Sequence, residues 1–300
     1  MTDRKVRGRF APSPTGPLHF GSLVAAVGSY LSARSQGGEW LVRMEDLDPQ
    51  REVKGAADDI LRTLDAYGFE WQGDVLYQSR RRDAYEDALA SLRRCGALYP
   101  CGCTRKEIAD SSIAGIEGPV YPGTCRSGLA AGRSARALRV RTDNAVIDFE
   151  DRVQGRQHAA IEREIGDFVA RRADGFYAYQ LAVVVDDAEQ GITEIVRGAD
   201  LLASTACQIY LQRLLGLPTP GYSHLPAAVN DQGEKLSKQT FAKPLARVRP
   251  VAALRQALDF LGQGPLPDVG ESSLASFWAA AMAAWDEKRI PRLRTLRCID

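Results

Sequence analysis

The sequence contains no long apolar run, no internal repeat and no low-complexity arm. None of its segments approaches the roughly 18 consecutive apolar residues of a membrane helix, and residues 1–4 lack a signal-peptide core, so we expect a cytoplasmic protein without membrane contact. A net charge of only +1 excludes wholesale coating of nucleic acid and leaves RNA contacts to local arginine patches. With 300 residues and 45% hydrophobic content, the chain has room for one large or two small domains.

Lysine is also scarce, with seven lysines against 32 arginines in a total of 39 basic residues. Three of the seven fall within nine residues, at Lys235, Lys238 and Lys243. Where arginine is the usual cation, compact ammonium groups clustered around Ser237 indicate a loop that neutralises a polyphosphate during a reaction. The alternative is a solvated surface loop, which this segment alone does not exclude.

A second segment, residues 9–22, combines the end of a strand, a rigid loop and the start of a helix. We predict a strand over residues 6–10 and a helix over residues 20–33, joined by three prolines and Gly16. A helix N-terminus offers unpaired N–H groups that suit a phosphate or carboxylate. Gly21 would let a flat nucleotide lie against the backbone, and His19 would point at phosphate oxygens, although such a histidine more often packs or caps.

Together the two segments resemble the signature motifs of class I aminoacyl-tRNA synthetases, His-Ile-Gly-His and Lys-Met-Ser-Lys-Ser. In this chain the motifs read His19-Phe20-Gly21-Ser22 and Lys235-Leu236-Ser237-Lys238-Gln239. The replacement of the second histidine by serine is similar to the glutamyl branch of the class. Residues 9–16, 43–48 and 196–200 resemble further blocks of that branch, and the five blocks occur in the same order between about residues 6 and 245.

The resemblance implies a site for ATP and a site for glutamate. The implied ATP-binding residues are His19, Gly21, Ser22, Lys235, Ser237 and Lys238. Of these, His19, Lys235 and Lys238 would be catalytic. The implied glutamate-binding residues are Arg9, Ala11, Ser13, Glu45, Tyr179 and Arg197. Two cations and one anion match the charges of glutamate, and Glu45 would meet its ammonium group unless it forms a structural ion pair with Arg43.

Six cysteines in a chain without a secretory signal indicate thiols or metal ligands. Cys101 and Cys103 flank one glycine, and Cys125 follows a loop rich in glycine and proline, which favours a tetrahedral zinc site. The residues alone leave the fourth ligand open, with Asp110 the nearest candidate. In small relatives of the glutamyl synthetases a tyrosine four positions before the last cysteine completes the site, so the resemblance implies Tyr121 and one structural zinc.

The resemblance implies an α/β fold: a class I, doubly wound parallel (Rossmann-like) sheet with a zinc-bearing insertion and a short helical C-terminal region. We place the first half of the nucleotide-binding fold at residues 1–75, the insertion at 76–175, the second half at 176–245 and the helical region at 246–300. The continuously apolar run at 177–185 predicts a buried parallel strand, ended by Asp186 and Asp187. A strand over 193–196 and a helix over 199–215 would follow.

Only 62 residues (300 minus 238) follow Lys238, fewer than a separate anticodon-reading domain of about 100 to 200 residues would need. Together with the resemblance, this short C-terminal region implies that the chain is similar to the truncated relatives of the glutamyl synthetases, which lack the anticodon-binding part. These activate L-glutamate with ATP and Mg²⁺ without tRNA, and attach it to the queuosine base in the anticodon stem-loop of tRNA-Asp. We expect a monomer. The alternatives are a glutamyl-tRNA synthetase fragment charging tRNA-Glu, another adenylate-forming enzyme, and a non-catalytic RNA-binding module.

Overall fold

The computed structural model describes residues 5–111, 114–115, 118–236, 243–266 and 273–298. The helices are α1 (Phe20–Arg34), α2 (Ala56–Ala66), α3 (Arg82–Arg94), α4 (Arg105–Ser111), α5 (Ile161–Glu164), α6 (Tyr179–Glu189), α7 (Leu202–Leu215), α8 (Pro250–Phe260) and α9 (Leu274–Ala284). The strands are β1 (Arg7–Phe10), β2 (Glu39–Met44), β3 (Leu76–Tyr77), β4 (Leu98–Cys101), β5 (Ala114–Gly115), β6 (Gly118–Pro119), β7 (Ala137–Val140), β8 (Val146–Asp151), β9 (Gly155–Ala160), β10 (Val169–Arg171), β11 (Glu194–Gly198), β12 (Gly221–Leu225), β13 (Ala227–Val229) and β14 (Thr295–Arg297).

The centre of the molecule is a parallel layer with the order β3-β2-β1-β11-β12. Strands β1, β2 and β3 pair in parallel, as do β11 and β12. The backbone N–H of Thr193 donates to the Arg7 carbonyl at 2.9 Å and so places β11 beside β1. The chain therefore winds outward in both directions from the junction of β1 and β11, which is the doubly wound arrangement predicted from the resemblance. In such sheets, ligands bind at the carboxyl ends of the strands beside this junction.

Helix α1 follows β1 and is buried along most of its length. His19 caps its N-terminus, since the His19 side chain accepts the backbone N–H of Ser22. Gly28 lies against the β12 end of the sheet, where a Cβ atom would come within 2.4 Å of a Leu225 methyl group. The absence of a side chain at this one position lets α1 pack closely on the sheet. The predicted helices at 20–33 and 199–215 are confirmed as α1 and α7, and α7 ends at Gly216 with a positive φ of 66°.

The prediction of a buried strand at residues 177–185 is wrong, because residues Tyr179–Glu189 form helix α6. Leu181 to Val184 are all at most 1% exposed, so consecutive residues around the whole helix circumference are buried. Helix α6 packs against both α3 and α7. A helix that is apolar all round shows no amphipathic period, and a short run of this kind cannot be told from a buried strand. Asp186 and Asp187, predicted to end the strand, lie inside the helix and are buried.

The segment predicted as an insertion contributes to two structures. An antiparallel sheet with the order β10-β7-β4 lies at one end of the molecule together with α4. The β8–β9 hairpin instead extends the central layer, because β8 pairs in parallel with β12 through Asp151 and Tyr222. This pairing places Asp151 beside β12, in the second half of the nucleotide-binding fold.

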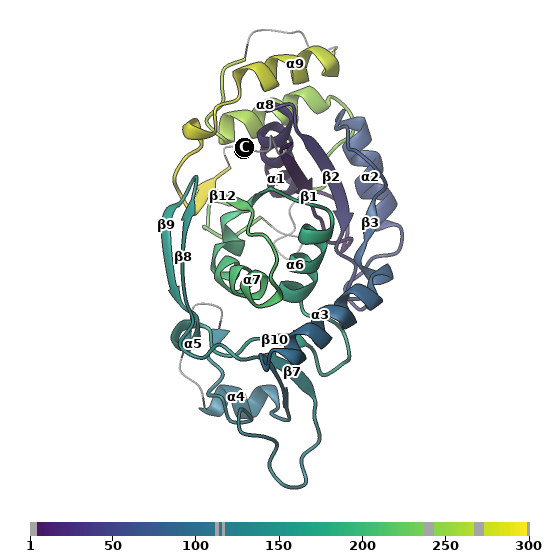
Figure 1. The fold of residues 1–300 in the computed structure, drawn as a ribbon. Helices are drawn as coiled ribbons and strands as arrows, with labels where there is room; N and C mark the ends of the chain where they lie inside the picture. The colour runs from purple at the N-terminus through teal and green to yellow at the C-terminus, as the bar shows by residue number, and fades with distance from the viewer. Residues whose placement is uncertain (1–4, 112–113, 116–117, 237–242, 267–272, 299–300) are drawn as a thin grey trace.

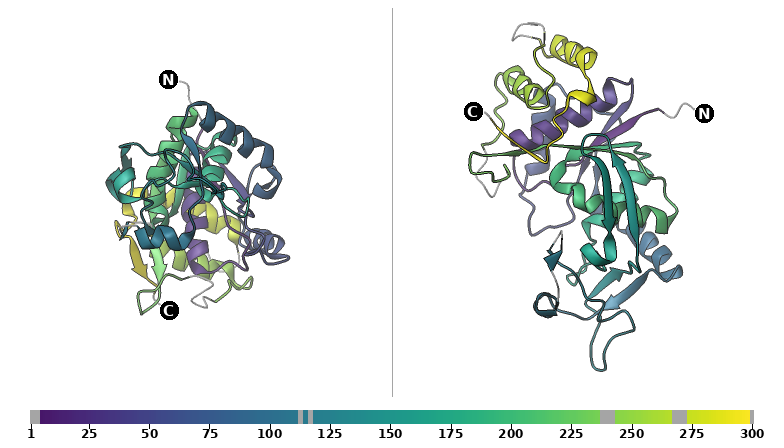
Figure 2. Two further views of the ribbon diagram at one scale, coloured as in Figure 1. Left: turned by 90° about the horizontal axis from the view of Figure 1, so that it is seen from below. Right: turned by 90° about the vertical axis from the view of Figure 1, so that its left-hand side faces the viewer.

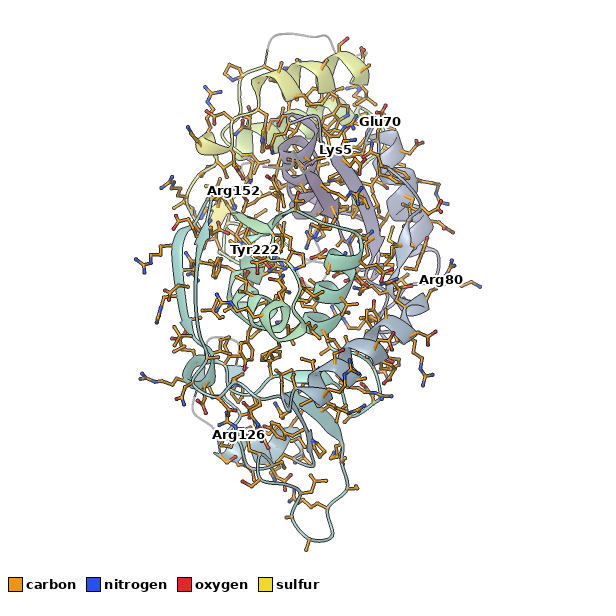
Figure 3. All side chains as sticks on the ribbon, viewed as in Figure 1. Lys5, Glu70, Arg80, Arg126, Arg152 and Tyr222 are labelled. Atoms are coloured by element: carbon orange, nitrogen blue, oxygen red, sulfur yellow. The ribbon has the colours of Figure 1, made fainter. Side chains whose placement is uncertain are left out.

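The C-terminal region lies at the opposite end, where α8 and α9 stack beyond α1 (Figure 2). It is helical as predicted, but it also supplies strand β14, which pairs in parallel with β13. No helix in the described ranges is long and apolar enough to cross a lipid bilayer. Charged side chains such as those of Glu70 and Arg80 point outward from the fold (Figure 3).

Candidate active site

A pocket of about 800 Å³ opens at the carboxyl ends of β1, β2, β11 and β12. All of the residues that the sequence assigned to ATP and glutamate, and that the structure describes, line this one pocket: Arg9, Ala11, Ser13, His19, Gly21, Ser22, Glu45, Tyr179, Arg197 and Lys235. They come from four widely separated parts of the chain. Ser237 and Lys238, the other two predicted ATP-binding residues, lie outside the described residues.

The His19 loop forms one wall of the pocket. His19 Nδ1 accepts the Ser22 N–H at 3.4 Å, which directs the ring along the first turn of α1. A Cβ atom on Gly21 would lie 3.2 Å from the His19 ring, closer than side chains normally approach. The absence of a side chain at Gly21 therefore leaves room for the imidazole of His19.

The described residues on either side of positions 237–242 pair through their backbones with segments that line the pocket. The Leu236 N–H donates to the Ala228 carbonyl at 2.8 Å, and beyond the loop the Leu245 N–H donates to the Leu18 carbonyl at 2.9 Å. Lys235 forms an ion pair with Asp200, which follows β11. Two segments more than 200 residues apart in the sequence thus meet across one pocket.

Arg9 and Glu45 belong to a buried charge network beneath the pocket. Arg9 forms a two-pronged ion pair with Asp187 of α6, with N···O distances of 3.0 and 3.4 Å. Arg43, which is fully buried, lies 2.8 Å from the same carboxylate and 3.6 Å from Glu45. Both interpretations of Glu45 are therefore compatible with the geometry, because its carboxylate pairs with Arg43 and still lines the pocket. Burial raises the pKa of Glu45 to about 7, against the opposing effects of Arg43 and Arg9.

Arg197 is held differently from Arg9. Its guanidinium donates to His224 Nε2 at 3.0 Å, to the Tyr179 hydroxyl at 3.3 Å and to Thr205 Oγ1 at 2.9 Å. These acceptors carry no carboxylate, and within the described residues Arg197 forms no ion pair. Arg197 is 5% exposed and lines the pocket, so its charge faces the space where a ligand would lie.

Several residues that shape the pocket were missed at the level of sequence. Asp187 was assigned to the end of a strand, and His224 and Asp151 were not singled out. The sequence carried no signal for them, because each acts on a residue from a distant segment. Asp48, which follows Glu45 in the same motif block, forms an ion pair with Arg172 at 3.0 Å.

The cysteine cluster lies in the segment predicted as an insertion, away from the pocket. The sulfur atoms of Cys101, Cys103 and Cys125 lie within 4.8 Å of one another, and those of Cys103 and Cys125 are 3.6 Å apart. Tyr121 Oη lies 3.4 Å from Cys101 Sγ and 3.7 Å from Cys103 Sγ. For zinc–sulfur bonds of about 2.3 Å and zinc–oxygen bonds of about 2.0 Å, tetrahedral geometry requires separations of about 3.8 Å (S···S) and 3.5 Å (S···O). The four side chains therefore fit one tetrahedral ion, and within the described residues Asp110 does not belong to the cluster.

The fold and the pocket define an enzyme class. Residues 5–258 match the family model described as tRNA synthetases class I (E and Q), catalytic domain, and the chain belongs to this family of ligase-type enzymes.

Within that class the chain is similar to proteins named Glutamyl-Q tRNA(Asp) synthetase. It is 63% identical to the one from Dechloromonas aromatica (strain RCB) over 288 residues, which cover 95% of this chain and 96% of the relative. It is 58% identical to the one from Chromobacterium violaceum, with 97% of both chains covered.

The fold is also that of solved glutamate-tRNA synthetases. A crystal structure from Elizabethkingia anophelis superposes with a TM-score of 0.80 at 24% identity and covers 98% of this chain and 68% of that one. A glutamate tRNA ligase from Elizabethkingia meningosepticum, in complex with its amino acid, gives a TM-score of 0.79 at 25% identity and covers 99% of this chain and 67% of that one.

Proposed function

We propose that the protein activates L-glutamate with ATP without the help of tRNA, and then transfers the glutamate to the queuosine base in the anticodon loop of tRNA-Asp. The observation that carries the first step is the convergence of every described ATP and glutamate candidate on one pocket. The names of the relatives, at 63% and 58% identity over almost the whole chain, support the second step.

The activation step requires positioning and charge rather than a protein nucleophile. A carboxylate oxygen of glutamate attacks the α-phosphorus of ATP, and the bond to pyrophosphate breaks. His19, the N-terminus of α1 and Lys235 line the side of the pocket suited to phosphates, with Ser237 and Lys238 as further candidates. Mg²⁺ bound to ATP would share the neutralisation of the phosphates.

Glutamate matches the other side of the pocket in charge. Its two carboxylates and one ammonium group correspond to Arg9, Arg197 and Glu45, all of which line the pocket. Tyr179 adds a hydroxyl next to Arg197, and Ala11 and Ser13 supply a narrow wall after β1. A polar ligand that pairs all of these groups leaves no buried charge without a partner.

The proposed function is tested with ATP, radiolabelled glutamate and tRNA-Asp prepared with and without queuosine. We expect glutamate-dependent pyrophosphate exchange in the absence of tRNA, and label only on tRNA-Asp that carries queuosine. Label on tRNA-Glu, or on tRNA-Asp without queuosine, would instead support a glutamyl-tRNA synthetase activity. No exchange at all would support the RNA-binding module.

The pKa of Glu45 predicts how glutamate affinity changes with pH. Only the ionised carboxylate attracts the substrate ammonium group, and burial, the dominant influence, raises the pKa of Glu45 to about 7. The protonated fraction therefore grows as the pH falls, and KM for glutamate should rise about tenfold between pH 8 and pH 6. In the Glu45→Gln variant KM should be high and independent of pH, whereas exposed Glu70→Gln should behave like the unchanged protein. A flat KM profile in the unchanged protein would contradict the assignment.

We also propose that Cys101, Cys103, Tyr121 and Cys125 hold one structural zinc ion. The separations of the donor atoms support this, and the ion would tie Cys103, Tyr121 and Cys125 to Cys101 at the end of strand β4. We expect about one zinc per chain by atomic absorption in protein purified without chelator. Cys125→Ser should lose the metal and have a lower Tm. The matched variant Cys95→Ser, at an exposed free thiol, should keep the zinc and the Tm of the unchanged protein. Metal-free protein with an unchanged Tm would contradict the proposal.

A further inference from the structure

A buried histidine and a buried aspartate lie behind the pocket and are not used by the activation step. His224 is on β12 and Asp151 is at the end of β8, and both are 0% exposed. The pairing of β8 with β12 brings them together, with Asp151 Oδ2 2.6 Å from His224 Nδ1. Tyr222, which Figure 3 labels at the centre of the fold, stacks on the His224 ring at 6.2 Å.

The hydrogen bonds around Asp151 define it as an ionised acceptor. Its Oδ1 accepts the backbone N–H groups of His224, Val153 and Gln154, at 3.1, 3.1 and 2.8 Å. Although burial pushes the pKa of Asp151 upward, the hydrogen bonds from His224 and the backbone hold it below its ordinary value. An ionised carboxylate can only accept, so the proton between Asp151 and the imidazole is on His224 Nδ1.

The other ring nitrogen of His224, Nε2, faces a group that can only donate a hydrogen bond. Arg197 Nε, which always carries a hydrogen, lies 3.0 Å from His224 Nε2. A second proton on Nε2 would place two donors and two positive charges against each other. Burial, together with Arg197, lowers the pKa of His224 to about 4, although Asp151 and Asp200 act in the other direction. His224 is therefore neutral at pH 7, with its Nε2 lone pair directed at Arg197.

We propose that Asp151 and His224 are positioning residues that orient Arg197 toward a carboxylate of the amino-acid substrate. Asp151 sets the Nδ1–H tautomer, and that tautomer presents a neutral acceptor to Arg197 Nε. This inference rests on the proposed activation of glutamate. If His224 positions Arg197 in this way, the two arginines of the pocket have different roles. Arg9 is already paired with the buried carboxylate of Asp187, whereas Arg197 is fixed by neutral acceptors and keeps its full charge for the ligand.

The tautomer can be observed without any assay of activity. The chain has three histidines, so long-range ¹⁵N–¹H spectra can be assigned with His224→Gln and His158→Gln variants. We expect His224 to show a protonated Nδ1 and an unprotonated Nε2 throughout pH 6 to 8. In Asp151→Asn the new amide can donate to Nδ1, which favours the opposite tautomer and turns Nε2 into a donor facing Arg197. A His224 that is Nε2-protonated or an imidazolium at pH 7 in the unchanged protein would overturn the proposal, even if the variants failed to fold.

Glutamate-dependent pyrophosphate exchange then tests the link to substrate binding. Asp151→Asn and His224→Leu should raise KM for glutamate about 10- to 100-fold and leave KM for ATP within about twofold. His224→Gln, whose amide oxygen can still accept from Arg197, should recover part of the loss. The matched control is His158→Gln, because His158 and Asp148 form an exposed pair on the neighbouring strands, 3.0 Å apart.

The results separate this inference from the proposed function. Absence of exchange in the unchanged protein would refute glutamate activation itself. Two other results, each with normal exchange in the unchanged protein, would refute the positioning role alone. In the first, Asp151→Asn and His224→Leu raise KM for glutamate and KM for ATP equally. In the second, neither variant raises KM for glutamate.

Discussion

Replacing Arg197 with methionine is expected to reduce kcat/KM for glutamate in pyrophosphate exchange by about a thousandfold. Arg197 is 5% exposed and makes no ion pair with a described residue, so a substrate carboxylate would be its charged partner. Removing one member of such a buried pair costs about 4 kcal/mol, and each 1.4 kcal/mol corresponds to a factor of ten. Methionine keeps an unbranched chain as far as the Nε position of arginine and removes only the guanidinium end, so the loss is mainly one of charge and hydrogen bonds.

The matched control is Arg213→Met, at an exposed arginine in the last turn of α7. It removes the same charge from the chain and should leave kcat/KM within about twofold. KM for ATP should change little in both variants, because the role proposed for Arg197 is in binding glutamate. A loss of less than tenfold in Arg197→Met would contradict its assignment to the substrate carboxylate.

Replacing Arg43 with methionine is expected to destabilise the protein by about 3 to 5 kcal/mol. Arg43 is 0% exposed and lies between three carboxylates, at 2.8 Å from Asp187, 3.6 Å from Glu45 and 4.0 Å from Asp186. Without the guanidinium, these buried acids lose their common counter-charge. A loss of this size should lower the Tm by about 10 °C in thermal unfolding followed by circular dichroism.

The control for Arg43 is Arg62→Met, which breaks the exposed pair with Asp59 on helix α2. Exposed pairs of this kind contribute less than about 1 kcal/mol, so the Tm should fall by no more than about 3 °C. If Arg43→Met and Arg62→Met had the same Tm, the buried network around Arg43 would not stabilise the fold. Such a result would also weaken the view that Asp187 holds Arg9 in place.

The elements that the sequence predicted correctly have strong local signals. Helix α1 begins at the His19 cap, and α7 ends at Gly216, where the backbone enters the left-handed region. The spacing of the cysteines predicted that they cluster, and the sulfur atoms of Cys101, Cys103 and Cys125 lie within 4.8 Å of one another. Each of these features depends on residues close together in the chain, so a short stretch of sequence is enough to predict it.

The error at residues 177–185 has a different origin. Alternation or helical period reveals which face of an element is buried, but residues 181–184 of α6 are buried at four successive positions, and the helix packs against both α3 and α7. The pattern then contains no period, and the choice between strand and helix depends on neighbours elsewhere in the chain. Strand β14 was missed for a related reason, since its three residues become a strand only by pairing with β13.

The sequence by itself determined the family and the chemical groups of the pocket, because its motif blocks contain the residue types of the family's motifs and occur in the same order along the chain. Only the tertiary structure decided how those groups are charged and held. Asp187 reaches Arg9 from 178 positions away, and Asp151 reaches His224 from 73 positions away. Whether an arginine is neutralised by a buried carboxylate or left charged for a ligand depends on such long-range contacts, which have no signature in local composition or spacing.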